Sequence, residues 1–257
     1  MDYLLTSSID LAEILFTLFW IFFAFLVLYL HRESKREGYP LQADRFGRPA
    51  SIEGFPGVPK PKTYHLRDGS TVSLPRAEPA ESVAAVATAG FPGAPLEPTG
   101  NPMTDGVGPA AWCDRADHPD MTMRGLPQIA PLRIADDYHV ESRDVDPRGM
   151  NVVAADNYVV GKIRDLWVDR IEPQIRYMEI SLDDRIGGGN VLLPYYFCRI
   201  NAGRGEVKVS SLMSDQFSAV PKTKHPDQVT LLEEDKICAY YAGGKLYAEP
   251  SRTEPIL

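Results

Sequence analysis

The sequence contains few of the residues from which catalytic and metal sites are built. Its three cysteines stand apart with no C-x-x-C pair, and its five histidines are scattered without the spacing of zinc ligands. It also has no phosphate-binding loop, no nucleophile elbow and no dinucleotide-binding fingerprint. These absences argue against a self-contained enzyme and against a metal site formed by this chain.

Positive charge is also scarce. The 27 Lys and Arg residues are outnumbered by 35 Asp and Glu residues, which gives a net charge of -8 at pH 7. Binding to a phosphate backbone needs a basic surface. The charge balance therefore argues against a nucleic-acid partner.

Long hydrophobic runs are absent after residue 30, but one precedes it. From Ile14 to Leu30 only Thr17 is polar, and a helix over residues 11–30 would be about 30 Å long, the thickness of a bilayer's hydrocarbon core. A core helix of a soluble protein rarely runs this long and then ends in a basic cluster. We therefore predict a single N-terminal transmembrane helix.

The charges that flank this run predict its orientation. Residues 1–13 carry three acidic residues and no Lys or Arg, whereas the six residues after the run include Arg32, Lys35 and Arg36. The positive-inside rule then places the N-terminus outside and the rest of the chain in the cytoplasm. A cleaved signal peptide would have a basic segment before the run and a small-residue cleavage site after it, and the sequence shows neither. We therefore expect the helix to remain as an anchor.

Residues 37–135 have the composition of an extended segment. The stretch from Pro40 to Pro131 holds 15 of the 22 prolines and 10 of the 20 glycines, near the level at which a segment stops folding on its own. It also holds aromatic residues that a solvated linker would not need. We therefore expect extended chain that lies on another surface, with one β-hairpin over residues 63–74 that turns at Asp68 and Gly69.

Residues 136–257 show the pattern of a compact, mainly-β domain. Short apolar or alternating runs between turn residues predict strands over 158–168, 177–182, 191–200, 206–210 and 229–232. The second run alternates residue by residue, as in a strand with one buried and one exposed face. Strands at this spacing suggest a small β-barrel. Glu233 should open a C-terminal helix through Tyr241, which Gly243 and Gly244 should end.

The predicted fold is therefore a single N-terminal transmembrane helix plus a cytoplasmic mainly-β domain with a C-terminal helix. Three regions follow from it. They are a transmembrane anchor with a basic flank (1–36), an extended segment (37–135) and the β domain (136–257).

Acidic residues gather in the β domain, at positions 165, 169, 172, 179, 183 and 184. Carboxylates held close together cannot all ionise freely, so some of their pKa values would rise and the cluster could pass protons between water and a buried acceptor. A solvated acidic face explains the same residues without any function, and the pattern alone favours that interpretation. His118, near Asp117 and Asp120, offers a surface proton acceptor with the same alternative.

Several short blocks occur together in an order and spacing that resemble one known family. They are REGYPL (36–41) after the helix, PKPKT (59–63), DGVGPA (105–110) with Trp112 close behind, WVD (167–169) and TLLEEDKIC (230–238). In these blocks the chain resembles the H subunit of the photosynthetic reaction centre of purple bacteria, from the anchor to the final helix.

The resemblance implies a fold, partners and a role. In this family a cytoplasmic part built on a PRC-barrel caps the L and M subunits in the bacterial inner membrane, including its intracytoplasmic (chromatophore) extensions. The L and M subunits hold the bacteriochlorophylls, bacteriopheophytins, quinones, carotenoid and non-haem iron, so this chain is expected to bind none of these principally. It would stabilise that core, shield the quinone sites and assist proton delivery to the secondary quinone. A light-harvesting antenna would surround the complex, and a cytochrome subunit would be an optional further partner.

The resemblance also assigns roles to residues by their family position. Glu172 would be the relay carboxylate nearest the secondary quinone, Asp169 a second acid on the same turn, and Arg176 their electrostatic counter-ion. The residues expected at the lipid interface, where phospholipid would bind, are Arg32, Lys35, Arg36 and Tyr39.

The surface at which protons are taken up is assigned less directly. Some relatives carry histidines in the loop before Ile129, where this sequence has Arg124 and Leu126. The candidate replacements are the nearby titratable residues Asp117, His118 and Asp120.

Two other classes of protein share parts of this pattern. A membrane-tethered PRC-barrel adaptor would recruit a cytoplasmic partner, would tolerate loss of Asp169 and Glu172, and would not copurify with pigment. A tethered hydrolase would show turnover without partners, but no nucleophile or metal constellation accompanies the carboxylates.

Overall fold

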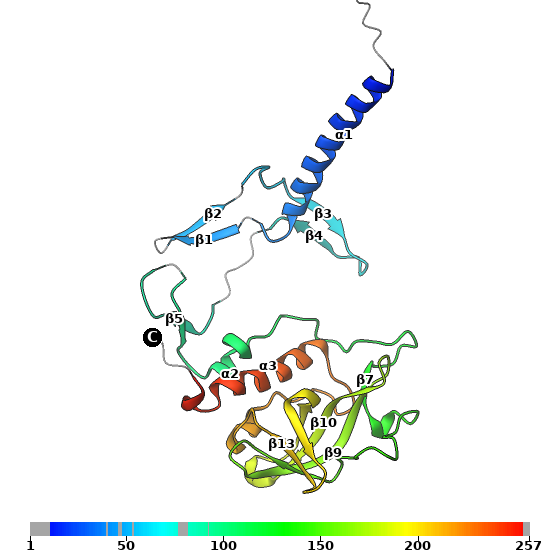
Figure 1. Ribbon diagram of the computed structural model, residues 1–257, viewed down its shortest axis with the longest axis vertical. Helices are drawn as coiled ribbons and strands as arrows, with labels where there is room; N and C mark the ends of the chain where they lie inside the picture. The colour runs from blue at the N-terminus through cyan, green and yellow to red at the C-terminus, as the bar shows by residue number, and fades with distance from the viewer. Residues whose placement is uncertain are drawn as a thin grey trace, which may run out of the picture. The chain divides into compact units, whose positions relative to one another are not determined.

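The computed structural model of the chain describes residues 11–39, 41–45, 48–52, 54–76, 82–91 and 93–253. By its internal contacts the chain divides into two compact units, whose elements are labelled in Figure 1. The first comprises Met1–Ser82 and Ala87–Pro95, and the second comprises Val83–Val86 and Leu96–Leu257.

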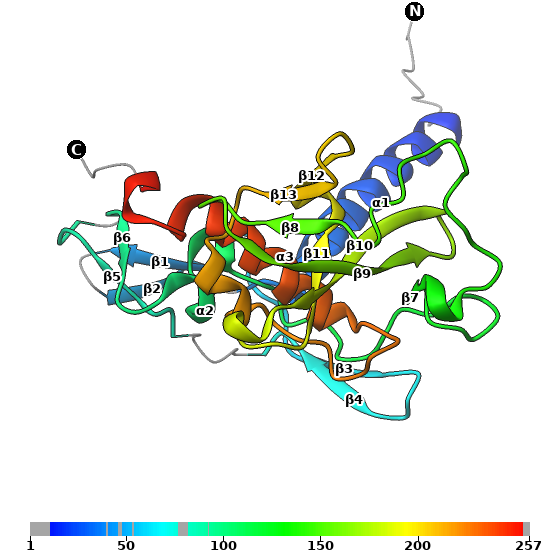
Figure 2. The same cartoon turned by 90° about the horizontal axis from the view of Figure 1, so that it is seen from below.

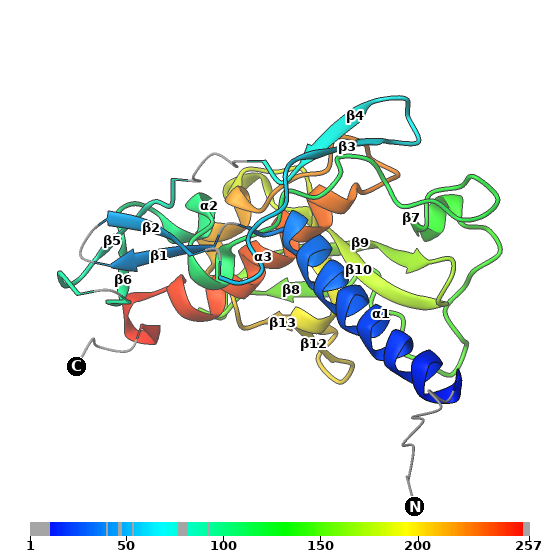
Figure 3. The same ribbon diagram turned by 90° about the horizontal axis from the view of Figure 1, so that it is seen from above.

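The first unit begins with the apolar helix that the sequence predicts. Helix α1 (Leu11–Glu33) continues into a short 3-10 helix, η1 (Ser34–Arg36), and forms one unbroken rod (Figure 3). No residue of α1 is buried within the chain. A helix that is apolar on all sides and uncovered by its own chain is suited to lipid or to the apolar faces of partner helices. By length and composition α1 can cross a membrane.

Three two-stranded sheets follow α1 along the chain. They are β1 (Leu41–Arg45) with β2 (Arg48–Ile52), β3 (Lys62–His65) with β4 (Thr71–Leu74), and β5 (Ala85–Ala87) with β6 (Leu96–Pro98). The antiparallel β3–β4 hairpin confirms the prediction for residues 63–74. Its turn is closed by a 3.1 Å hydrogen bond from the Gly69 N–H to the Leu66 carbonyl, and the φ of +84° at Gly69 is one that favours glycine.

The second unit opens with short elements that lead to its main sheet. Helix α2 (Pro102–Asp105) is capped by Asn101, whose side chain accepts a 3.1 Å hydrogen bond from the Met103 N–H. The other elements of this stretch are η2 (Gly108–Ala110), β7 (Ile129–Pro131) and η3 (Leu132–Ile134). All three residues of β7 are buried, so this short strand ties the segment to the domain core.

The main sheet has seven strands arranged around one long central strand. Strand β9 (Val159–Asp169) pairs with β10 (Gln174–Leu182) along one edge, and with β8 (Asn151–Val153) and β7 along the other. The sheet order is β11-β10-β9-β8-β13-β12, and β8 lies between β9 and β13 (Figure 2). The outer strands are β11 (Asn190–Pro194), β13 (Glu206–Val209) and β12 (Cys198–Asn201). Only the β13–β8 pairing is parallel among the pairings of the described residues.

A C-terminal helix covers the sheet. Helix α3 (Leu231–Tyr247) begins with a capping box in which the Thr230 hydroxyl accepts from the Glu233 N–H at 3.1 Å and the Glu233 carboxylate accepts from the Thr230 N–H at 2.9 Å. Its buried residues Ile237 and Tyr241 join the core formed by the strands. The predicted mainly-β domain with a C-terminal helix is confirmed. In the described part of the chain no pairing joins β11 to β12, so the sheet does not close into a complete barrel.

The predicted ends of the C-terminal helix are wrong. Residues 229–232 form no strand; instead Thr230 is the N-cap and Leu231 opens the helix. The helix also continues through Gly243 and Gly244 to Tyr247. The reason is packing: a Cβ at Gly243 would lie 2.6 Å from the Ala110 Cβ, so the absence of a side chain lets α3 approach η2 closely.

Two predictions about strands also need correction. The run 191–200 is two strands, because the chain turns into the 3-10 helix η5 (Tyr195–Phe197) after Pro194. The run 177–182 is not a half-buried strand, since both Met178 and Glu179 are buried. The remaining 3-10 helices are η4 (Asp184–Ile186), η6 (Ser214–Ala219) and η7 (Pro250–Arg252).

Candidate functional site

Asp169 ends strand β9 and its side chain is completely buried. Its carboxylate accepts hydrogen bonds from Gln128 Nε2 at 2.9 Å, from the backbone N–H groups of Ile171 at 2.9 Å and Glu172 at 3.1 Å, and from Arg176 Nη2 at 3.1 Å. Burial alone would raise the pKa of Asp169, but these donors outweigh burial and lower the pKa. Asp169 is therefore held ionised, contrary to the expected rise.

Glu172 lies on the same turn but faces solvent. Its side chain is 68% exposed, and its Oε2 lies 3.7 Å from Arg176 Nη2 and accepts a 3.0 Å hydrogen bond from Gln174 Nε2. The buried Asp169 holds this turn in place, because its carboxylate accepts a hydrogen bond from the backbone N–H of Glu172. The structure thus brings together the three residues that the family resemblance assigned to one relay: Asp169, Glu172 and Arg176.

The other acidic residues of the predicted cluster lie elsewhere. Asp165 and Glu179 contact Arg133, and Asp183 and Asp184 are exposed near η4. The six carboxylates therefore do not form one cluster. The spacing of the acidic residues in the sequence suggested a single cluster. That spacing does not show that β9 and β10 direct these side chains to separate places.

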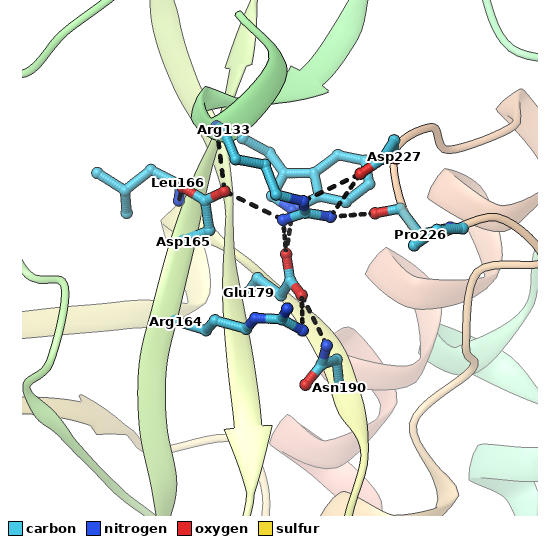
Figure 4. Close-up of polar contacts among 9 residues, drawn as sticks. Arg133, Arg164, Asp165, Leu166, Glu179, Asn190, Pro226 and Asp227 are labelled. Carbon is cyan, nitrogen blue, oxygen red and sulfur yellow. Dashed lines mark hydrogen bonds and ion pairs between the residues drawn. The ribbon is translucent and has the colours of Figure 1, made fainter.

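Arg133 organises an ion network around two buried carboxylates that the sequence analysis missed (Figure 4). Its Nη1 lies 3.0 Å from Asp165 Oδ2 and 2.5 Å from Glu179 Oε2, and its Nη2 lies 2.9 Å from Asp227 Oδ1. Glu179 also accepts from Trp167 Nε1 at 3.2 Å. Asp165 and Glu179 have little exposed surface, so Arg133 compensates two buried charges and ties η3 to the loop at Asp227.

The three candidates for surface proton uptake differ in what they contact. Asp117 forms an ion pair with Lys224 and accepts a 3.0 Å hydrogen bond from the Thr230 hydroxyl, and these contacts, the Lys224 hydrogen bond first, lower its pKa. The ring of His118 contacts only the Pro119 carbonyl, at 3.2 Å, among the hydrogen bonds of the described residues.

Asp120 differs because it lines a pocket that leads to Arg176. Asp120, Gln128, Arg176 and Glu234 all line a pocket of about 220 Å³. A second pocket, of about 200 Å³, shares Arg176 and Glu234. Of the three candidates, Asp120 is the one in the walls of these pockets.

Glu234 is a second residue that the sequence analysis missed. It lines both pockets and accepts a 3.0 Å hydrogen bond from the Tyr177 hydroxyl. Burial raises the pKa of Glu234, and the Tyr177 hydrogen bond opposes that rise. No sequence signal distinguishes Glu234 from its neighbours, because the fold decides what each carboxylate contacts: Glu233 caps α3 and Asp235 accepts from the Cys113 N–H.

Comparison with known protein families decides what these sites belong to. A family model for the N-terminal region of the photosynthetic reaction centre H chain matches residues 3–134, and a PRC-barrel domain model matches residues 139–213. The first match alone covers more than half of the chain. The chain belongs to the photosynthetic reaction centre H-chain family.

Membership of the H-chain family confirms the resemblance seen in the sequence. Members of the family are structural, membrane-associated subunits of the reaction centre. They associate with the L and M subunits and are not themselves enzymes. The complex of which they are part carries pigments and quinones. In this H chain, α1 is the helix suited to the membrane.

Two of the basic residues near the end of α1, Lys35 and Arg36, contact their own unit. Lys35 is 4% exposed and donates a 2.7 Å hydrogen bond to the Pro56 carbonyl, and its Nζ lies 5.3 Å from the centre of the Tyr39 ring. Arg36 pairs with Glu33 at 2.8 Å. Arg32 is exposed. Of the expected interfacial residues, Lys35 and Arg36 thus have defined partners within the chain.

Proposed function

We propose that this chain caps the L and M subunits on the cytoplasmic side and assists proton delivery to the secondary quinone. The observation that carries the proposal is the arrangement at the end of β9, where an exposed carboxylate, Glu172, stands on a turn that a buried ionised carboxylate, Asp169, fixes. A proton relay needs a carboxylate that reaches solvent or a partner and keeps a defined position.

In this proposal Glu172 carries the proton and the other two residues position it. Asp169 is a poor proton carrier because its carboxylate accepts several hydrogen bonds and its pKa is lowered. It holds the turn instead. Arg176 bridges the two acids, because its Nη2 lies 3.1 Å from Asp169 Oδ2 and 3.7 Å from Glu172 Oε2.

We infer that protons reach this turn through the pockets lined by Asp120 and Glu234. Asp120 is exposed at the surface, and Glu234 is a partly buried carboxylate with a raised pKa that shares both pockets with Arg176. Spaces of about 200 Å³ with charged walls have room for several water molecules, which can bridge such groups. Asp117 is engaged by Lys224 and Thr230, so we assign proton uptake to Asp120 rather than to Asp117 or His118.

The membrane topology is part of the same proposal. The basic flank of α1 favours a cytoplasmic location for the residues after it and a periplasmic N-terminus. Arg32 and Tyr39 would meet lipid headgroups, and Lys35 and Arg36 would anchor the helix end to its own unit. The chain would then work as a membrane anchor (1–36), a segment that packs on partner subunits (37–135) and a β domain (136–257).

Purification of the chain from its native membranes in mild detergent tests this function. We expect the L and M subunits to copurify, with bacteriochlorophyll absorption bands in the near infrared that bleach on illumination. A colourless preparation that retains a different partner would contradict the proposal and favour a membrane-tethered adaptor.

A further inference from the structure

A basic pocket lies at the β12 end of the sheet, which is the end opposite to β11 in the strand order. It has a volume of about 440 Å³ and is built from η5, β12, β13 and α3. Three of the residues that line it are cationic, namely Arg199, Lys208 and Lys245, and none is acidic. In a chain with a net charge of -8, a pocket whose charged lining residues are all cations calls for an explanation.

Two of these cations face each other across neighbouring strands. Arg199 of β12 and Lys208 of β13 are direct cross-strand partners. Side chains in this position have Cβ atoms about 5 Å apart, and like charges placed there destabilise the sheet. Protection of an exposed sheet edge explains Arg199, since β12 is the last strand of the sheet, but it does not explain Lys208. Strand β13 is paired on both sides, with β12 and with β8.

The three cations have no anionic partner among the described residues. The contacts of Lys208 and Lys245 are with neutral atoms, the Asn157 Oδ1 and the Ser210 Oγ, the latter at 3.0 Å. Glu206, two residues before Lys208 on the same strand, makes no ion pair with any of them within the described part of the chain. Lys245 also lies in the last turn of α3, where a cation is favoured by the helix dipole.

We propose that this pocket binds a phosphate group. An anion between Arg199 and Lys208 would replace their repulsion with charge-assisted hydrogen bonds, and Lys245 would reach it from α3. Tyr196, which is 74% exposed, and Phe197 add aromatic walls beside the cations, so the pocket can also contact an uncharged part of the ligand. Both a soluble phosphate compound and a phospholipid headgroup have this chemistry.

Calorimetric titration of the full chain in a nonionic detergent tests the site. The two probes are inorganic pyrophosphate and glycerophosphoglycerol, the deacylated headgroup of a phospholipid. We expect saturable binding of at least one probe, weakened by about tenfold or more in Lys208→Gln and in Arg199→Gln, because each loses a charge-assisted hydrogen bond. Stronger binding of pyrophosphate would identify a soluble phosphate as the ligand, and stronger binding of the diester would identify a headgroup.

The matched control is Arg204→Gln, which removes an exposed cation from the turn between β12 and β13 without changing the pocket. It should bind the probes as the wild type does. Absence of saturable binding of both probes would overturn the proposal. Equal weakening in Lys208→Gln and Arg204→Gln would also overturn it, because the binding would then reflect general charge rather than this pocket. If Lys208→Gln does not fold, the binding of the probes is compared between wild type and Arg199→Gln, whose substitution lies on the edge strand β12.

Discussion

The carboxylate of Asp169 is completely buried and lies 3.1 Å from the guanidinium of Arg176. Because the backbone N–H groups of Ile171 and Glu172 donate to the same carboxylate, the pair also fixes the turn after β9. The position of Glu172 therefore depends on an ion pair beneath it. This relationship connects the stability of the β domain with its proposed role.

Replacement of Asp169 by Asn should destabilise the chain and change its response to acid. The pKa of Asp169 is lowered in the folded state. Ionised Asp169 therefore contributes fully to the free energy of unfolding above the unfolded pKa of about 3.9, and this contribution is lost as the pH falls through the folded pKa. We expect a loss of about 3 kcal/mol at pH 7, since Arg176 loses its buried partner, and a smaller difference from wild type at pH 3. Urea unfolding of the full chain in detergent at both pH values measures this.

The matched control for that variant is Asp183→Asn, an exposed carboxylate with no capping hydrogen bond. It should change the free energy of unfolding by less than about 0.5 kcal/mol. A difference between Asp169→Asn and wild type that stays constant from pH 7 to pH 3 would show that ionised Asp169 does not supply the stability.

Removal of Arg133 should lower the free energy of unfolding more than removal of an arginine that pairs with no buried carboxylate. Arg133→Gln leaves Asp165 and Glu179 buried without their cation. We therefore expect the free energy of unfolding, measured with a chemical denaturant, to fall by about 3 to 5 kcal/mol. Arg143→Gln is the comparison, because Arg143 is 89% exposed and pairs loosely with Glu141 at 3.7 Å; its cost should be below about 1 kcal/mol. Similar costs for the two variants would mean that the Arg133 network contributes no net stability.

A Gly244→Ala change should destabilise the chain although alanine is the better helix former. In an open helix the substitution gains about 1 kcal/mol. Here the new Cβ would overlap the Ser211 carbonyl oxygen and lie 2.6 Å from Leu212 Cδ2, so we expect a net loss of about 1 to 3 kcal/mol in thermal or urea unfolding. Gly203→Ala, whose Cβ would have only an ordinary contact at 3.7 Å, should be nearly neutral. A more stable Gly244→Ala protein would refute the packing argument.

These glycines show where sequence patterns stop being informative. The apolar run of α1 and the β3–β4 hairpin follow from local chemistry, and both were predicted. The end of α3 was not, because Gly243 and Gly244 usually stop a helix and here permit close packing against residues more than 30 positions away. That packing is a property of the fold, which no local pattern contains.

The site was predictable to the same extent. Asp169, Glu172 and Arg176 were assigned together by the family resemblance, whereas the pattern of acidic residues alone favoured a solvated face. Arg133 and Asp227 are 94 positions apart, and no spacing rule connects them. The burial that raises the pKa of Glu234 likewise depends on the packing of α3 against the sheet.

Asp120→Asn should slow proton uptake by the reaction centre if protons enter beside it. The carboxylate is exposed and lines the pocket that Glu234 and Arg176 share, so its loss removes the surface acceptor of the proposed route. Flash-induced proton uptake, followed with a pH indicator dye in the purified complex, measures the effect. Asp114→Asn, an exposed acid in the same segment that does not line these pockets, is the control. Equal uptake rates in both variants would place the route elsewhere.

The most direct test of the central claim is the second electron transfer to the secondary quinone in a Glu172→Gln reaction centre. In the proposed function that step takes up a proton from the cytoplasmic side, whereas primary charge separation moves only electrons. We predict that the second transfer slows by about tenfold or more while charge separation is unchanged, and that Glu141→Gln, which removes another exposed carboxylate, has no effect. An unaltered second transfer in Glu172→Gln would contradict the account.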